Sequence, residues 1–449
     1  MRVGFVSLGC SKNLVDTEMA IGLMKKLGFE IVSDPSQAEM IIINTCGFIQ
    51  SAKEEAIQTI FEMAEYKNSN CQYLVVMGCL VKRYKEELIK EIPEVDLFIS
   101  IEEYDQLANL IMNLINPNEN IEKSLNTLDY FDRIISTGST TAFLKIAEGC
   151  SNNCTYCAIP KIRGKYESRK FEDIVNEAKQ LASQGIRELI VIAQDTTKYG
   201  FDLYGKYRLA ELLEELSKIE EIEWIRFLYS YPESIDDNLI NVVKNNDKIC
   251  KYFDIPIQHY SNTVLKRMNR KTSSEDLENV ISKIRKNIPE VIIRTTVMVG
   301  FPDESEEDFD ALLNFIKKAK FDKLGCFMYS KADGTPASNL TDSVPKAVKL
   351  NRYRTIMTEQ AKISLESLKE KIGKEFEVLI EDYTEDGRYL IGRTYMDIPE
   401  EDGVIYIDNT PDFEIIIGEF YQCIVDDIAR IDPKDNSISN YDLIGHVII

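Results

Sequence analysis

The sequence predicts an α/β protein of three parts: an N-terminal parallel-sheet domain, a central partial (β/α)6 barrel and a small C-terminal five-stranded β-barrel. The first two parts are predicted because buried-type apolar strands alternate with amphipathic helices, which is typical of parallel sheets covered by helices. The third part is predicted because five short strands follow residue 372, with turn residues and no helix between them. We expect domains over residues 1–116, 136–368 and 371–449.

The N-terminal part alternates strands and helices four times. The expected strands are Val3–Leu8, Met40–Asn44, Tyr73–Met77 and Asp96–Ser100, and the expected helices are Asn13–Leu27, Ser51–Tyr66, Lys82–Glu91 and Tyr104–Asn113. Each strand is a continuous apolar run, as in a parallel sheet that is buried on both faces. Residues 116–135 are polar and weakly patterned, so we expect a linker there.

The central part repeats the strand–helix unit six times, which predicts a partial barrel with its active site at the carboxyl ends of the strands. The expected strands are Ala142–Ala147, Glu188–Ala193, Trp224–Tyr229, Tyr252–Ile257, Val291–Gly300 and Lys323–Ser330, and the expected helices cover 171–184, 207–218, 236–246, 274–287 and 304–319. A long helix over Lys346–Ile372 leads out of the barrel.

Composition narrows the class of protein. A chain of 449 residues with 44% hydrophobic residues is globular and too long for one ordinary core. It contains no apolar run of about 18 residues and does not begin like a signal peptide, so we expect a cytoplasmic protein without a membrane partner. A net charge of −22 argues against a broad nucleic-acid surface and favours a small substrate or a basic protein, although solubility alone is the alternative.

Three cysteines, Cys150, Cys154 and Cys157, form a C-x3-C-x2-C loop directly after the first strand of the predicted barrel. This spacing lets one loop surround a single metal centre. A cubane [4Fe–4S] cluster is normally held by four thiolates, so three leave one iron open for another ligand. The alternative is a structural zinc site, which needs a fourth Cys or His nearby, and the chain has only His259 and His446.

A second cysteine set is spread over the N-terminal part. Cys10, Cys46 and Cys79 each follow one of its first three predicted strands. Because the carboxyl ends of parallel strands share the sheet edge where such folds bind ligands, we expect these cysteines to converge. The alternative is that each is a small buried loop residue. The other cysteines are interpreted as core residues: Cys71, Cys250, Cys326 and Cys423.

The C-x3-C-x2-C loop after the first strand of a partial barrel resembles the signature of radical S-adenosylmethionine enzymes. The resemblance implies that Cys150, Cys154 and Cys157 are the catalytic residues, and that they hold a [4Fe–4S] cluster whose open iron binds S-adenosylmethionine. It further implies that this cofactor yields a 5′-deoxyadenosyl radical, while the protein positions it and excludes water.

The same resemblance suggests cofactor-binding residues. Tyr156 matches the aromatic residue that commonly precedes the last cysteine, and Gln194 and Asp195 lie where related barrels contact the methionine amino group. Gly300, at the end of the fifth barrel strand, suits a close approach of the adenosyl moiety. A helix-capping turn is the alternative for Gln194 and Asp195, and a simple turn is the alternative for Gly300.

The whole chain resembles the radical S-adenosylmethionine methylthiotransferases, with their separated N-terminal cysteines, radical core and terminal β-barrel of the TRAM type. This implies a second [4Fe–4S] cluster on Cys10, Cys46 and Cys79, which handles the sulfur. It also implies two uses of S-adenosylmethionine, one as methyl donor and one as radical source. A sulfur donor and a low-potential electron donor are the implied partners.

Two branches of this family compete. One acts on an adenosine of tRNA, and the other on the β-carbon of an aspartate in the twelfth protein of the small ribosomal subunit. The segments that resemble the second branch are SLGCSKNLVDTE, NTCGFIQSAKEE, CTYCAIPKIRGKYESR, AQDTTKYG, LYSYPESI, DIPIQH and RTTVMVGFPDE. Tyr231-Pro232 and His259 stand where we expect a His-Pro and a Gln-Ser-Gly run in the tRNA enzymes.

Charge gives an independent argument for the protein substrate. From Ile372 onward the chain has 19 acidic and 5 basic residues. A barrel that binds tRNA needs an excess of Lys and Arg, because these residues neutralise the phosphates of the RNA backbone. An acidic surface favours a basic ribosomal protein, and a solvated acidic face without a partner is the alternative. A non-catalytic iron–sulfur protein, of the electron-transfer or scaffold kind, is a further alternative.

Three local features remain open. Asp303 departs from the Gly-Phe-Pro-Gly-Glu turn of the family, which leaves the backbone of the turn and the role of Glu304 undecided. His259, at the end of the fourth barrel strand, either faces the active-site cavity or makes a structural hydrogen bond. A basic run after the cluster loop either steers a carboxylate or cofactor or forms a solvated face; it comprises Lys161, Arg163, Lys165, Arg169 and Lys170.

Overall fold

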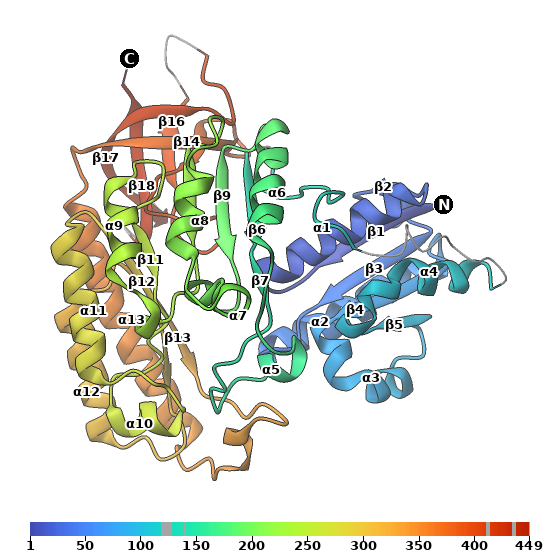
Figure 1. Cartoon of the computed structure of the whole chain (residues 1–449), viewed down its shortest axis with the longest axis horizontal. Helices are drawn as coiled ribbons and strands as arrows, with labels where there is room; N and C mark the ends of the chain where they lie inside the picture. The colour runs from blue at the N-terminus through green and yellow to red at the C-terminus, as the bar shows by residue number, and fades with distance from the viewer. Residues whose placement is uncertain (118–127, 139, 410–413, 433–436, 449) are drawn as a thin grey trace.

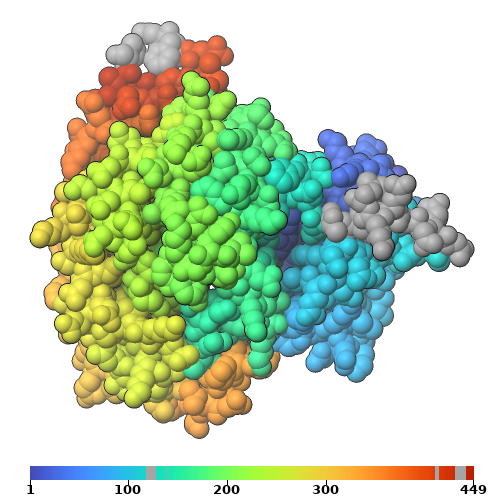
Figure 2. All heavy atoms as spheres, viewed as in Figure 1, coloured from blue at the N-terminus to red at the C-terminus, as the bar shows by residue number. Residues whose placement is uncertain are grey.

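The computed structural model describes residues 1–117, 128–138, 140–409, 414–432 and 437–448, and it has the three expected parts (Figure 1). The N-terminal domain forms a lobe on one side of the central barrel (Figure 2). The C-terminal barrel lies at one end of the central barrel, beside strands β6 (Thr141–Lys145) and β9 (Glu188–Ile192) (Figure 1). None of the helices in these described ranges is long and apolar enough to span a bilayer.

The N-terminal domain is a parallel sheet of order β2-β1-β3-β4-β5. Its strands are β1 (Arg2–Ser7), β2 (Glu30–Val32), β3 (Met40–Thr45), β4 (Tyr73–Gly78) and β5 (Leu97–Ile99), and its helices are α1 (Ser11–Lys26), α2 (Gln50–Ala64), α3 (Cys79–Glu91) and α4 (Leu107–Ile115). The sequence did not predict β2, because this three-residue edge strand carries no apolar run. The fourth predicted helix begins as a 3-10 turn at Ile101–Gln106.

The central barrel has six parallel strands in two ladders, β6-β9-β10 and β11-β12-β13. Its remaining strands are β10 (Trp224–Phe227), β11 (Tyr252–Asp254), β12 (Ile292–Val299) and β13 (Lys323–Met328), and its long helices are α6 (Phe171–Ser183), α8 (Leu209–Leu216), α9 (Asp237–Asn245), α11 (Ser274–Asn287) and α12 (Glu306–Ala319). A parallel bridge from Ile225 to Ile249 joins the two ladders. The predicted partial (β/α)6 barrel is therefore confirmed.

Short elements that the sequence did not predict surround the cysteine loop. They are the two-stranded ribbon β7 (Ala147–Glu148) and β8 (Glu167–Ser168), and the single-turn or two-turn helices α5 (Ile159–Ile162), α7 (Phe201–Tyr204) and α10 (Asn262–Arg267). Elements of this length have no periodic hydrophobic pattern to reveal them.

Helix α13 (Lys346–Lys369) leads to a closed five-stranded barrel of order β14-β15-β16-β18-β17, as predicted. The strands are β14 (Glu375–Tyr383), β15 (Tyr389–Arg393), β16 (Ile405–Asp408), β17 (Phe420–Asp432) and β18 (Ser437–Val447). Closure leaves no free edge that would pair with another chain.

Helix α1 closes the open side of the central barrel. Its Val15 and Met19 pack in one buried cluster with Ile190 and Ile192 of β9 and with Tyr252 of β11. The N-terminal domain is thereby docked against the inner face of the barrel rather than merely tethered to it. Cys10 is the N-cap residue of this helix, so the docking sets the position of that cysteine relative to the barrel.

The predicted linker is partly structured. Residues 118–127 lie outside the described ranges, but Arg133 is buried. Its guanidinium pairs with Glu18 of α1 (3.2 Å) and with Glu177 of α6 (3.1 Å). This segment therefore helps to join the two domains, which its polar composition did not indicate.

Candidate active site

The C-x3-C-x2-C loop leaves the ribbon strand β7 and is held in a tight curve. Gly149 has φ +73°, and a Cβ atom there would lie 2.1 Å from the carbonyl oxygen of Lys165, so only glycine fits. The hydroxyl of Thr155 donates to the carbonyl of Arg267 (2.8 Å), which fixes the far side of the loop to α10.

The cysteines of this loop lie close enough to influence one another: Cys150 and Cys154 raise the pKa of Cys157, and Cys154 raises that of Cys150. Cys150 and Cys154 are buried and Cys157 is half-buried. Burial, followed by the charges of Asp195 and Cys154, raises the pKa of Cys150, and burial likewise raises the pKa of Cys157 to about 12. The thiols of Cys150 and Cys157 therefore stay protonated at neutral pH, and a metal cluster bound there would have to displace their protons.

Two side chains approach the sulfur of Cys154. The hydroxyl of Tyr231, just after β10, lies 3.8 Å from Sγ, and Nη1 of Arg270, just after α10, lies 3.9 Å from it. The Arg270 guanidinium also stacks over the Tyr231 ring, 4.4 Å from its centroid. Hydrogen bonds to cluster sulfurs are among the features that set the reduction potential of such sites.

Gln194 presents an unused acceptor beside this loop. Its Nε2 donates to Glu148 (2.9 Å), but its buried Oε1 has no partner among the described residues. Asp195 is engaged differently, since it accepts hydrogen bonds from Asn152 (2.7 Å) and Thr197 (2.8 Å) and so holds the cluster loop. An orphaned carbonyl oxygen fits an ammonium donor such as the amino group of S-adenosylmethionine.

The turn after β12 keeps its form despite Asp303. Asp303 adopts φ +60°, in the left-handed region that glycine favours, and its carboxylate accepts a hydrogen bond from Ser343 (2.9 Å). Glu304 accepts hydrogen bonds from the backbone N–H groups of Gly300 and Phe301, so its role is to cap this turn.

Gly300 is packed against the side chain of Lys349. Its φ is +73°, and a Cβ atom there would lie 2.3 Å from Cγ of Lys349 on α13. The close approach that needs glycine is thus to a protein side chain, and a contact with the adenosyl moiety stays a prediction.

A cavity of about 310 Å³ opens between the N-terminal domain and the barrel. Tyr156, Gln258 and Met298 line it from the barrel, and Phe48 and Lys53 line it from the N-terminal domain. The cavity therefore joins the cysteine loop to the segment that follows Cys46. It suits a group with an apolar body and a few polar contacts.

Cys10, Cys46 and Cys79 lie at the carboxyl ends of the neighbouring strands β1, β3 and β4. Burial and the other two cysteines raise the pKa of Cys79, to about 12, and burial and Cys10 raise that of Cys46. A Cβ atom at Gly9 would lie 2.5 Å from Cβ of Cys46, so the backbone around Cys10 closely approaches Cys46.

Neither set suits a single metal ion. Within the described ranges, no three His, Cys, Asp or Glu side chains meet in a group that a single ion requires. A cubane cluster is compatible with wider spacing, because each thiolate binds a different iron. The four remaining cysteines are buried, as expected of core residues.

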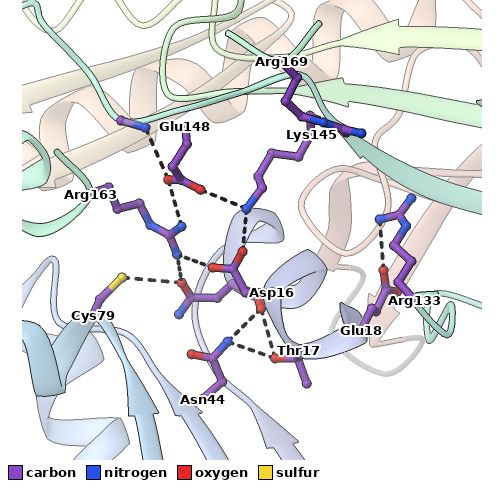
Figure 3. Close-up of polar contacts among 12 residues, drawn as sticks. Asp16, Thr17, Glu18, Asn44, Cys79, Arg133, Lys145, Glu148, Arg163 and Arg169 are labelled. Carbon is purple, nitrogen blue, oxygen red and sulfur yellow. Dashed lines mark hydrogen bonds and ion pairs between the residues drawn. The ribbon is translucent and has the colours of Figure 1, made fainter. Parts of the chain in front are cut away.

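A buried polar network extends from Cys79 to Glu148, which lies two residues before Cys150 (Figure 3). Asp16 of α1 accepts hydrogen bonds from Lys145 and from Arg163 (2.9 Å), and both cations also pair with Glu148 (2.9 and 3.0 Å). Burial acts to raise the pKa of Glu148, but Lys145 and Arg163 outweigh it and hold that pKa well below its usual range.

Asn13 extends the network to the second set. Its Oδ1 accepts hydrogen bonds from Arg163 and from the thiol of Cys79 (3.5 Å). The path thus runs from Cys79 through Asn13 and Arg163 to Glu148, which precedes Cys150 by two residues and also accepts from Gln194.

The five basic residues after the cysteine loop fall into two groups, exposed lysines and arginines that make ion pairs. Lys161, Lys165 and Lys170 are exposed, as a solvated face requires. Arg163 is buried in the network, and Arg169 pairs with Glu177 (2.5 Å). The sequence did not identify Asn13 or Asp16, because polar residues on an apolar helix reveal their partners only in the folded chain.

His259 makes a structural hydrogen bond. It is fully buried, its Nδ1 accepts a hydrogen bond from the backbone N–H of Ser261 (3.0 Å), and its Nε2 has no partner among the described residues. Burial, the largest influence, lowers its pKa to about 3, so the ring is neutral at pH 7.

Comparisons with known proteins cover the whole chain. Residues 144–316 match the Radical SAM superfamily, residues 2–100 match Uncharacterized protein family UPF0004, and residues 372–448 match the TRAM domain. The chain is 58% identical over 447 residues to ribosomal protein uS12 methylthiotransferase RimO of Alkaliphilus oremlandii, covering 100% of this chain and 99% of that one. It is 50% identical to the protein of that name in Clostridioides difficile, with the same coverage.

Solved structures support the fold alone. The radical S-adenosylmethionine methyltransferase TsrM from Kitasatospora setae, solved with cobalamin and a [4Fe–4S] cluster, is 12% identical with a TM-score of 0.56, over 75% of this chain and 74% of that one. The cobalamin-dependent S-adenosylmethionine radical enzyme OxsB is 14% identical with a TM-score of 0.52, over 81% of this chain and 57% of that one.

Proposed function

Because the chain belongs to the family of ribosomal protein uS12 methylthiotransferases named RimO, we propose that it inserts a methylthio group at the β-carbon of an aspartate in uS12, the twelfth protein of the small ribosomal subunit. It is a radical S-adenosylmethionine enzyme, and its cofactors are iron–sulfur clusters and S-adenosylmethionine. The observation that carries the proposal is full-length similarity at 58% identity, across all three parts of the chain.

The six cysteines form two separate sites, each of which would hold one cluster. Cys150, Cys154 and Cys157 would hold the radical cluster, and the set of Cys10, Cys46 and Cys79 would hold the second cluster, in the domain over residues 1–116. When bound, the clusters and S-adenosylmethionine supply a 5′-deoxyadenosyl radical, a methyl group and a site for the added sulfur.

The surrounding side chains position these groups. The free Oε1 of Gln194 would accept a hydrogen bond from the amino group of S-adenosylmethionine, and Tyr156 would contact its adenosyl part in the shared cavity. Asp195 acts through Asn152 by holding the cluster loop in shape. Helix α1 covers the open side of the barrel and so excludes water from the reacting groups.

The C-terminal barrel favours a basic protein substrate over tRNA. Its acidic residues include many on the surface: Glu375, Asp382, Glu385, Asp386, Asp408, Glu419, Asp426 and Asp427. Of its basic residues, Arg393 is buried in ion pairs with Glu188 and Glu381, which leaves it unable to bind phosphates. A surface of this sign attracts a basic ribosomal protein and repels a nucleic-acid backbone. We place the reaction in the cytoplasm, with a sulfur donor and a low-potential electron donor as partners.

A direct test offers both candidate substrates to the same enzyme. Anaerobically reconstituted protein would be mixed with S-adenosylmethionine, sulfide and a reductant, together with either uS12 or tRNA, and the products would be weighed by mass spectrometry. We expect uS12 alone to gain the mass of one methylthio group in place of one hydrogen. A gain on tRNA and none on uS12 would refute the proposal.

A further inference from the structure

Lys12 is a buried cation that has no hydrogen-bonded anion among the described residues. It lies in the first turn of α1, and only 6% of its surface is exposed. Its Nζ lies 3.0 Å from the centroid of the Tyr229 ring, and no described residue accepts a hydrogen bond from Nζ or forms an ion pair with it. Burying an ammonium without hydrogen-bond partners costs free energy that one aromatic face only partly offsets.

The nearest carboxylates are already engaged. Cys10, Glu401 and Asp254 act on Lys12 only through longer-range attraction, and the two carboxylates, Glu401 and Asp254, pair with Arg294, at 2.5 and 3.6 Å. The hydroxyl of Ser230, which follows Tyr229 in the chain, is also buried and has no hydrogen-bond partner in the part of the chain that the structure describes. The junction of α1 with the segment after β10 thus contains a cation and a hydroxyl whose hydrogen-bonding capacity is unused.

This junction lies between the two cysteine sets. Lys12 follows Cys10 by two residues, and Tyr229, which it contacts, precedes Tyr231 by two residues. The Tyr231 hydroxyl is 3.8 Å from the sulfur of Cys154. A small anion bound at Lys12 would therefore lie with the second cluster site on one side and the radical cluster site on the other.

We propose that Lys12 binds the carboxylate of the target aspartate of uS12. The inference rests on the proposed function, and it names the residue that recognises the substrate. The β-carbon is bonded directly to the carboxylate carbon, so an ammonium that fixes the carboxylate also fixes the reacting C–H bond. A carboxylate supplies the charge-assisted hydrogen bond that Lys12 lacks. The methionine carboxylate of S-adenosylmethionine has the same chemistry and is the other possible source.

The test compares two variants with a matched control. Lys12→Met removes the charge but keeps the length, Lys12→Arg keeps the charge but moves the donor atoms, and Lys25→Met changes an exposed lysine on the same helix. Each protein is assayed with uS12 and with uS12 in which the target aspartate is replaced by asparagine. Iron content and the Kd for S-adenosylmethionine are measured in parallel.

We expect Lys12→Met to raise the KM for uS12 at least tenfold, with iron content and S-adenosylmethionine affinity within twofold of the wild type. With the asparagine substrate, the wild type should lose a similar factor and Lys12→Met should lose nothing further. Lys12→Arg should keep a KM near the wild-type value but lower kcat at least tenfold, because the C–H bond is displaced. Lys25→Met should behave as the wild type does.

Other outcomes overturn the proposal in distinguishable ways. Weaker binding of S-adenosylmethionine, with an unchanged KM for uS12, would assign the carboxylate to the cofactor. Wild-type kinetics in the Lys12 variants would make Lys12 a structural counter-charge for Asp254 and Glu401. If Lys12→Met does not fold, an unchanged kcat in Lys12→Arg refutes the proposal by itself. A wild type that never modifies uS12 would instead refute the proposed function.

Discussion

Arg163 of the central barrel donates a hydrogen bond to Asp16 of helix α1, with 2.9 Å between Nη2 and Oδ2, and both side chains are almost completely buried. The pair crosses the junction between the domains that carry the two cysteine sets (Figure 3). We expect Asp16→Asn to lower the free energy of unfolding by about 3–5 kcal/mol, because two buried cations would then share Glu148 alone. Thermal and denaturant unfolding would measure the loss.

A surface ion pair provides the control for that prediction. Lys26 and Asp132 are 2.6 Å apart but both are exposed, so Lys26→Met should cost less than about 1 kcal/mol. Because Asp16 and Arg163 share one network, the double variant Asp16→Asn with Arg163→Met should lose less than the sum of the single losses. Additive losses would show that the two side chains do not act together.

The two cysteine sets should be separable by replacement. We expect Cys154→Ala to abolish formation of 5′-deoxyadenosine and to remove one cluster's iron, because the loop then offers only two thiolates. Cys79→Ala should remove the iron of the other cluster and abolish methylthio transfer while 5′-deoxyadenosine still forms. Iron analysis and product chromatography measure both effects. Cys71→Ala, a buried cysteine outside both sets, is the control. Turnover by Cys154→Ala would show that the loop does not hold the radical cluster.

The hydroxyl of Tyr231 should influence the reduction potential of the radical cluster. Hydrogen bonds to a thiolate favour the more negative, reduced state, so Tyr231→Phe should make the potential more negative by on the order of 50 mV. A spectroscopic redox titration measures this shift. Tyr199→Phe is the control, because its hydroxyl bonds to the carbonyl of Arg169 and not to a cysteine. An unchanged potential in Tyr231→Phe would show that the 3.8 Å contact has no electronic effect.

His259 should make stability depend on pH. Burial holds its pKa at about 3 in the folded chain, against an ordinary value of 6.5, so only the unfolded chain takes up the proton between these pH values. Stability is therefore full above pH 6.5 and falls with acidification, by about 2 kcal/mol at pH 5. His259→Gln should lose this part of the pH dependence in denaturant unfolding, whereas variants of the exposed His446 should retain it. Identical slopes for wild type and His259→Gln would contradict the prediction.

Most regular elements were predictable because their hydrophobic periodicity is strong. The apolar strand Met40–Thr45 and the amphipathic helix Glu306–Ala319 can be recognised from their own hydrophobic pattern, without knowledge of what they pack against. The edge strand Glu30–Val32 was missed because three residues, one exposed and two half-buried, are too few to show a period. Asp303 could be recognised as a departure from a glycine turn, but only the backbone shows that it adopts the left-handed conformation itself.

The sequence alone determined the fold class of the three parts, and it predicted the two cysteine sets and the chemistry that three thiolates with one open iron allow. These follow from local spacing and from the shared edge of parallel strands. Only the tertiary structure decided that helix α1 fills the open barrel, that Arg163 is buried against Asp16, and that Lys12 has no hydrogen-bonded anion among the described residues. These facts depend on which side chains meet at a domain junction. The residues concerned are far apart in the chain, so no local sequence pattern indicates that they pair.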